Sequence, residues 1–335
     1  MSPLIWIGFL TFVAAMIAID LGLLNRKPHA ITVREALIWT VVWISLALTF
    51  NGLIYAIYQH SWLGVNTNHE PPLSGWKAAA LFFECYVLEY SLSIDNLFVI
   101  ALIIASFKIP AKSQHHVLLW GVLGAVVLRG VLIIAGTSLV ARFQWLFIVF
   151  GLFLIYSAGK MFFAGEEGEV DIEKSRLVRF IRRFYPVSTD TEQEQFFQTV
   201  DGVRHVTPMF LTILLVESFD LIFALDSIPA VMGVLANTPD PFLAFTSNIF
   251  AVLGLRSLYF ALAGMMDKFE YLKMSLVALL AFIGVKLLLH AHHSTKELIS
   301  DNMSLVVIGG ILSLGIIVSL ISARFGAPKP PVDQS

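Results

Sequence analysis

Long apolar runs recur along most of the chain, and they restrict its fold more than any other feature. Each run is long enough to cross the hydrocarbon core of a bilayer as a helix. The runs lie at about 4–24, 36–58, 78–106, 115–139, 144–163, 208–235, 242–264, 272–290 and 303–322. Only 14% of the residues are charged, against about 25% in a soluble domain. The sequence therefore predicts an all-α, polytopic membrane protein with about nine transmembrane helices.

The distribution of positive charge predicts the orientation. Fifteen of the 22 Lys and Arg residues lie in one set of alternate loops, and the other set holds only Lys77, Arg142 and Lys296. Cytoplasmic loops carry the excess of positive charge in membrane proteins. The N-terminus is therefore expected outside and the C-terminus in the cytoplasm.

Two groups of three spans repeat one another. In the first group "EYSLSIDN" is followed by "GVLGAVVLR" and "FLIYSAGK", and in the second "DLIFALDS" is followed by "NIFAVLGLR" and "LLAFIGVK". The matched pairs are Glu89 and Asp220, Asp95 and Asp226, Asn96 and Ser227, Arg129 and Arg256, and Lys160 and Lys286. An odd number of spans per unit predicts that the second copy is inverted. Many secondary transporters consist of inverted repeats, with the substrate site near the midplane where the copies meet.

The repeat divides the chain into five segments. These are two leading transmembrane helices (1–77), the first three-helix repeat (78–163), a cytoplasmic loop (164–207), the inverted second repeat (208–290), and the final transmembrane helix with a cytoplasmic tail (291–335). Within the loop, "KSRLVRFIRRFYPV" has the apolar spacing and the basic residues of an interfacial amphipathic helix. The Asp201-Gly202 pair between β-prone residues predicts a hairpin.

The repeats place acids inside apolar spans. An ionised side chain at the bilayer centre costs at least about 2.5 kcal/mol, so it normally faces the bundle interior and has a partner. On regular helices Glu89 and Asn96 share one face, and Asp220 and Ser227 share the matching face of the second copy. Asp95 and Asp226 lie about 100° around the helix axis from these faces. All four acids converge only if the helices bend or unwind locally, for which Pro229 supplies a cause in the second copy.

These side chains offer carboxylate, amide and hydroxyl oxygens, which suit hard cations such as Mn²⁺, Mg²⁺ or Ca²⁺. The candidate metal ligands are Glu89, Asp95, Asn96, Glu217, Asp220, Asp226 and Ser227. Arg129 and Arg256 are candidate charge partners, and Asp20, Asn51, Ser91 and Ser93 are candidate pathway residues. The alternative interpretation is that the acids pair with the two arginines and only hold helices together. The two interpretations apply at different steps if an arginine neutralises the acids of the empty site and withdraws when metal binds.

The sequence resembles the TerC family of bacterial integral membrane proteins, including its Alx-type members, at "EYSLSIDNLF" and "ESFDLIFALDSIPA". The match extends from the helix of Asp20 to the final span and includes "FFQTVDGVRHVTP". The resemblance implies a metal-homeostasis protein related to LysE-like exporters, associated with Mn²⁺ export and, by older naming, with tellurium resistance. It also implies that the seven candidate ligands are the family's acidic-motif positions, and that the protein lies in a bacterial inner (plasma) membrane.

We therefore expect a transporter that exports a divalent cation from the cytoplasm, with Mn²⁺ favoured and other hard divalent cations open as cargo. Proton return through Glu89 or Glu217 is a candidate for the coupling. The second hypothesis is a non-transporting accessory or sensor protein in metal or tellurium resistance and secretion, which the long loop favours. We expect no enzymatic activity, since tellurite chemistry would require several thiols or a redox cofactor and Cys85 is the sole cysteine. The expected partners are a metal ion and the lipid bilayer, with no nucleic acid, and the sequence identifies no protein partner.

Overall fold

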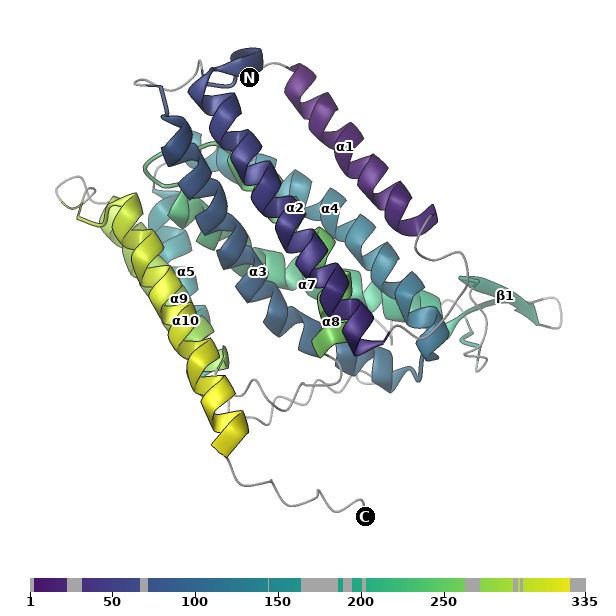
Figure 1. Ribbon diagram of the computed structural model, residues 1–335. Helices are drawn as coiled ribbons and strands as arrows, with labels where there is room; N and C mark the ends of the chain where they lie inside the picture. The colour runs from purple at the N-terminus through teal and green to yellow at the C-terminus, as the bar shows by residue number, and fades with distance from the viewer. Residues whose placement is uncertain are drawn as a thin grey trace.

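The computed structural model describes residues 3–22, 32–66, 72–143, 145–163, 186–188, 195–200, 203–262, 272–291, 295 and 298–325. Nine long helices and one two-stranded hairpin make up most of this part of the chain (Figure 1). The helices are α1 (Pro3–Gly22), α2 (Val33–Gln59), α3 (Gly75–Ser106), α4 (Ala111–Arg142), α5 (Leu146–Phe163), α7 (Pro208–Val234), α8 (Pro241–Leu262), α9 (Leu272–Ala291) and α10 (Asp301–Phe325). A short 3-10 helix, η1 (Trp62–Gly64), follows α2.

The all-α, polytopic fold is confirmed, because each predicted span coincides over most of its length with one of these helices. Six of them, α2, α4, α5, α7, α8 and α9, are long and apolar enough to cross a membrane. The count of nine spans stays a prediction, since α1, α3 and α10 are not in that group. Large apolar side chains such as Val41, Val127 and Val306 lie exposed on the outside of the bundle, as expected where a protein meets lipid rather than water.

Side-chain caps fix where several helices begin. Thr32, Ser74 and Thr207 each accept a hydrogen bond from the backbone N–H three residues later, at the starts of α2, α3 and α7. Asp240 accepts from the backbone N–H groups of Phe242 and Leu243 at the start of α8. Such oxygens satisfy N–H groups that have no partner inside the helix.

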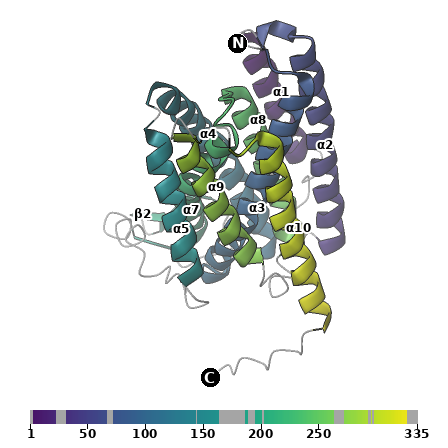
Figure 2. The same cartoon turned by 90° about the vertical axis from the view of Figure 1, so that its left-hand side faces the viewer.

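The helix packing has the pattern that a two-fold relation between the repeats would give. Helices α3, α4 and α5 of the first repeat correspond to α7, α8 and α9 of the second. The contact of α3 with α8 has its counterpart in the contact of α7 with α4. The contact of α5 with α7 likewise has its counterpart in that of α9 with α3. Matched helices also pack on one another, namely α3 with α7, α4 with α8, and α5 with α9, while α2 packs on α8 and α3 and α10 packs on α9 (Figure 2). This packing supports the inverted repeat, which itself stays a prediction.

Helices α5 and α9 approach closely through two glycines. A Cβ placed on Gly151 or on Gly284 would lie 2.9 Å from the carbonyl oxygen of the other residue. Small residues at such crossings let transmembrane backbones come together, and close packing contributes much of the attraction between helices in lipid. This contact fixes α5 beside the second repeat, where it forms one wall of the cavity described below.

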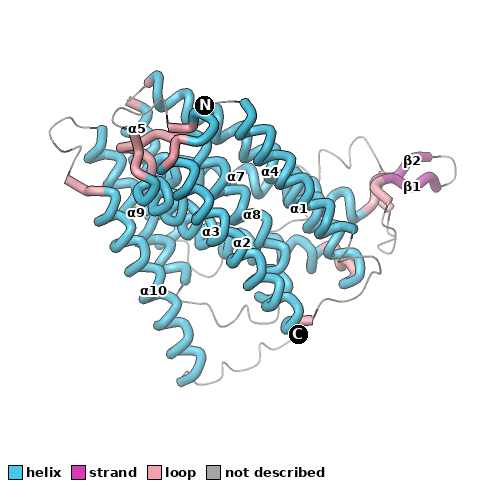
Figure 3. Tube along the Cα trace, turned by 45° about the horizontal axis from the view of Figure 1, so that its top comes forward, coloured by secondary structure: helices cyan, strands magenta, loops and turns pink. Residues whose placement is uncertain are grey.

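The predicted hairpin is confirmed by strands β1 (Phe197–Val200) and β2 (Val203–Val206), which pair antiparallel with Val200 opposite Val203. The hairpin projects beyond the helices at one end of the bundle (Figure 3). Asp201 and Gly202 of its turn lie outside the described residues, as do residues 174–185 of the predicted amphipathic helix at 174–187. Its last residue, Val187, is described and forms a parallel β-bridge with Val206 rather than part of a helix.

The orientation leads to a first testable prediction. Helix α1 begins at the end of the bundle opposite to the hairpin and to the end of α10 (Figure 1). In a Cys85→Ser background, we expect a cysteine at His60 to react with a membrane-impermeant maleimide in intact cells. A cysteine at Thr199 is expected to react only after the membrane is opened, because both positions are exposed and the predicted orientation places them on opposite sides of the membrane. Labelling at Thr199 in intact cells would reverse the orientation.

Candidate functional site

A buried arginine joins three helices at the centre of the bundle. Arg129 of α4 is 0% exposed, and its Nε and Nη2 donate to the two carboxylate oxygens of Asp220 on α7, at 3.1 and 2.7 Å. Its Nη1 forms an ion pair with Glu89 of α3, whose side chain is also 0% exposed. The Ser93 hydroxyl donates to Glu89 Oε1 at 3.5 Å. This Arg129 cluster is the pairing that the alternative interpretation of the sequence predicts for Glu89 and Asp220.

A third acid lies beside the cluster. Glu217, one helical turn before Asp220, is half-buried, and its Oε2 has no hydrogen-bond partner. Gly124 of α4 makes room for this carboxyl group, since a Cβ at that position would collide with it. Glu217 and Asp220 interact electrostatically. If all three acids are ionised, one guanidinium leaves the group with surplus negative charge.

Arg256, the repeat partner of Arg129, approaches Asp220 from α8. The two residues line a small cavity of about 30 Å³ between α3, α4, α7 and α8. A volume of this size holds about one water molecule. Asp220 therefore shares a small cavity with Arg256 and forms its bidentate pair with Arg129.

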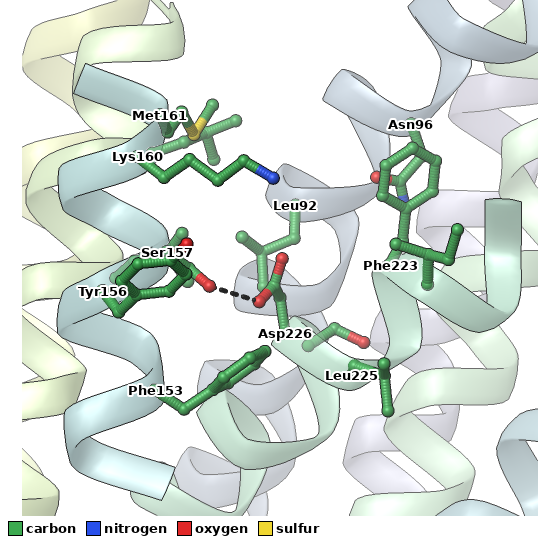
Figure 4. Close-up of a pocket in the computed structure, with 14 residues that line it drawn as sticks. Leu92, Asn96, Phe153, Tyr156, Ser157, Lys160, Met161, Phe223, Leu225 and Asp226 are labelled. Carbon is green, nitrogen blue, oxygen red and sulfur yellow. Dashed lines mark hydrogen bonds between the residues drawn. The ribbon is translucent and has the colours of Figure 1, made fainter. Parts of the chain in front are cut away.

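The second acid of α7 lines a larger cavity. Asp226, Ser227 and Asn96 line a space of about 430 Å³ between α3, α5, α7 and α9, which is partly open to the outside of the bundle beside the exposed side chains of Tyr156 and Leu225 (Figure 4). The Ser157 hydroxyl of α5 donates to Asp226 Oδ1 at 2.8 Å, and Lys160 extends into the same space. The other lining residues shown are mainly apolar, as with Leu92 and Phe223. We call this space the Asp226 cavity.

The structure thus distributes the predicted ligands over two centres. Helices α3 and α7 each run as one continuous α-helix through their motifs, despite Pro229. Six residues of regular helix separate Asp220 from Asp226 by about 9 Å along the axis and about 120° around it. The local unwinding that would bring them together is not present in these helices, so Asp220 joins the Arg129 cluster and Asp226 lines the cavity.

The remaining predicted residues divide into three groups. The Ser91 hydroxyl donates to the carbonyl of Val87 in its own helix at 2.7 Å, so it is satisfied locally. Asn51 is half-buried on α2, and its Oδ1 has no hydrogen-bond partner. Asp20 and Asp95 stand on α1 and α3, and their side chains lie outside what the structure describes. Among the described residues, no three His, Cys, Asp or Glu side chains lie close enough to hold a metal ion.

Sequence reasoning did not select Ser157 or Lys160 as site residues. Their signal was present, because both belong to the repeated "FLIYSAGK" segment and lie three residues apart, on one face of a helix. Lysines near helix ends commonly extend toward the membrane surface, and Lys160 is exposed, but its side chain also lines the cavity (Figure 4). Lys286, its repeat partner, is 3% exposed and donates to the carbonyl of Val234 at 3.4 Å.

These features define a polytopic membrane protein with ionisable groups buried in its centre. The chain belongs to the TerC family, since the family model described as "Integral membrane protein TerC family" matches residues 74–326. It is 42% identical over 332 residues to "Uncharacterized membrane protein STKORF319" of Myxococcus xanthus, covering 99% of this chain and 96% of that protein. It is 40% identical over 319 residues to "Putative membrane-bound redox modulator Alx" of Escherichia coli K12, covering 95% and 94%. No solved structure matches the chain.

The Arg129 cluster gives a second testable prediction. Replacing Arg129 by Gln leaves Glu89 and Asp220 without their cation, and removing one partner of a buried ion pair costs about 3–5 kcal/mol. We expect a correspondingly large fall in the thermal unfolding temperature of the purified protein in detergent. Arg142→Gln, at the exposed end of the same helix, is the matched control and is expected to cost less than about 0.5 kcal/mol.

A further variant separates charge balance from packing. Adding Asp220→Asn to Arg129→Gln removes one of the two uncompensated acids, so part of the lost stability is expected to return. An Arg129→Gln protein that unfolds at the same temperature as Arg142→Gln would show that the cluster does not hold the three helices together.

Proposed function

We propose that the protein exports a divalent cation from the cytoplasm, with Mn²⁺ as the favoured cargo, through acidic sites between its two repeats. The observation that carries the proposal is the Asp226 cavity, in which a carboxylate, an amide and two hydroxyls meet inside an apolar bundle. An ionisable residue within a membrane protein's core normally marks a path for ions or substrate. The proposal places the chain in a bacterial inner membrane, with its C-terminus in the cytoplasm.

The chemistry of the cavity favours a hard cation as cargo. Its Asp226, Asn96, Ser227 and Ser157 side chains all offer oxygen atoms, the donors that suit Mn²⁺ and Mg²⁺. The space of about 430 Å³ exceeds a bare ion many times over, since one water takes up about 30 Å³ in the liquid. The cation would therefore keep several of its water molecules when it binds there.

The Arg129 cluster supplies the part that moves. Its guanidinium neutralises Glu89 and Asp220 while no cargo is near them, and holds α3, α4 and α7 together. A cation that reaches these acids weakens their attraction for Arg129, because it competes for the same oxygens. Glu217, whose Oε2 has no hydrogen-bond partner, is the candidate for carrying a proton in return.

The second candidate function is an accessory or sensor role without transport. It is favoured by the Escherichia coli relative's name, which describes a membrane-bound redox modulator. In this chain the single thiol, Cys85, is 0% exposed on α3. A protein with one buried thiol would then affect the cellular redox state by way of a partner protein or by changing the metal concentration, rather than by dithiol chemistry of its own. We propose no enzymatic activity for this protein.

Mn²⁺ flux in proteoliposomes tests the proposal. Purified wild-type protein is expected to move Mn²⁺ down a gradient or against a pH difference. The Asp226→Asn and Asp95→Asn variants are expected to lose at least about tenfold in rate, because each removes a negatively charged ligand. Glu35→Gln, at the start of α2, is the control and is expected to stay within about twofold of wild type.

Each outcome separates the two candidates. Loss of flux in Asp226→Asn with normal insertion and unfolding temperature supports a cation path through the cavity. Wild-type protein that moves no divalent ion under either condition contradicts export, and the accessory role is then the one to pursue by seeking binding partners of residues 164–207.

A further inference from the structure

The inference concerns Lys160, whose ammonium shares the Asp226 cavity with the carboxylate. We propose that Lys160 is a tethered counter-cation, which balances Asp226 when the cavity is empty and competes with the cargo for it. The inference rests on the proposed transport function and assigns this residue a role in setting affinity. It follows from the cavity lining, the direction of the side chain and the charges on the two groups.

The cavity has a simple charge balance. Of the described residues that line it, only Asp226 and Lys160 carry a charge. Asp226 comes from α7 and Lys160 from the last turn of α5, so the two charges sit on different helices. An unpaired carboxylate inside a membrane protein is costly. A lysine in the same space offsets this cost while no metal is bound.

Ser157 fixes the geometry of the pair. It donates to Asp226 from one turn before Lys160, on the same face of α5. This hydrogen bond holds the carboxylate toward α5, where the lysine side chain enters the cavity (Figure 4). Ser157 therefore positions Asp226 for the lysine as well as for a metal ion.

Lys160 lies close enough to Asp226 for their charges to interact. In the described structure, however, no direct ion pair joins them, and part of the cavity separates the two groups. The lysine stem is long and flexible, and its ammonium is a compact charge. The ammonium can therefore approach the carboxylate when the cavity is empty and retract when a cation enters.

The repeat partner of Lys160 has a different role. Lys286 is buried and donates to the carbonyl of Val234, and it is not among the residues that line the Asp226 cavity. The sequence repeat therefore supplies a lysine in each half. Lys160 lines the Asp226 cavity, whereas Lys286 donates a hydrogen bond to a backbone carbonyl. Only Lys160 is positioned to compete with a cation at Asp226.

The proposal predicts opposite changes in affinity and in turnover. Lys160→Met keeps the length of the side chain and removes its charge. Without the repulsion from the ammonium, the Kd for Mn²⁺ is expected to fall about tenfold, since like charges a few ångströms apart repel one another by more than about 1 kcal/mol near a protein surface. Flux is expected to fall at the same time, because the cargo leaves more slowly and the empty cavity lacks its counter-charge.

The measurement uses the purified full-length protein. Binding of Mn²⁺ is followed by the loss of the free ion's electron paramagnetic resonance signal, and flux is followed in proteoliposomes. Lys77→Met, at the exposed start of α3, controls for the loss of one positive charge and is expected to leave both quantities unchanged. A Lys160→Met protein that binds Mn²⁺ as tightly as wild type or more weakly, while wild type still transports, overturns the inference and leaves the proposed function intact.

A second measurement needs no metal. The rate at which an amine-reactive reagent modifies Lys160 is determined by mass spectrometry, and it is expected to rise in Asp226→Asn, because the carboxylate no longer holds the ammonium. Equal rates in the two proteins overturn the pairing of Lys160 with Asp226. A third outcome is also possible: wild-type protein neither binds nor moves Mn²⁺, yet Lys160 is labelled faster in Asp226→Asn than in wild type. That result overturns the proposed function and the competition with cargo, but it supports the interaction of Lys160 with Asp226.

Discussion

The ion pairs of Arg129 are the interaction on which the centre of this structure depends. A guanidinium with no exposed surface meets Glu89 and Asp220 from two other helices, in a bundle whose outer surface is apolar. In such an environment neither sign of charge is tolerated alone. The three residues therefore require one another, and α3, α4 and α7 must lie together for any of them to be buried. The positions of the remaining acids follow from this contact.

The continuity of the helices determines how the acids are divided. Because α7 stays helical through its motif, Asp220 and Asp226 cannot share one ion, and they serve different surroundings. Asp220 is paired with Arg129 and shares a small cavity with Arg256, so it helps to hold α4 and α7 together. Asp226 faces a cavity that is large enough for a hydrated cation and is accompanied by hydroxyls and an amide. In the proposed transporter, the two acids of one motif would serve two tasks, Asp220 holding helices together and Asp226 receiving the cargo.

The same sequence repeat is used unequally in the two halves. Matched helices pack on one another in the pattern of a two-fold relation, yet Arg129 holds Asp220 in a bidentate pair and Lys160 and Lys286 point to different surroundings. If the predicted inversion of the repeat holds, exchanging the roles of the two halves gives a second arrangement, as the alternating access of the proposed transporter requires.

The sequence by itself determined the helical fold, the approximate positions of the apolar helices, the two strands on either side of Asp201-Gly202 and the identity of the polar residues inside the bundle. Apolar run length and helical period are local properties, so they can be read without coordinates. Which acid pairs with which cation was left open, because that depends on how helices distant in the sequence pack. Only the tertiary structure assigned Arg129 to Glu89 and Asp220. It also brought Ser157 and Lys160 to Asp226 and kept Asp220 and Asp226 apart. Contacts between helices depend on how each helix is rotated about its axis and how closely the helices approach, which no local sequence pattern determines.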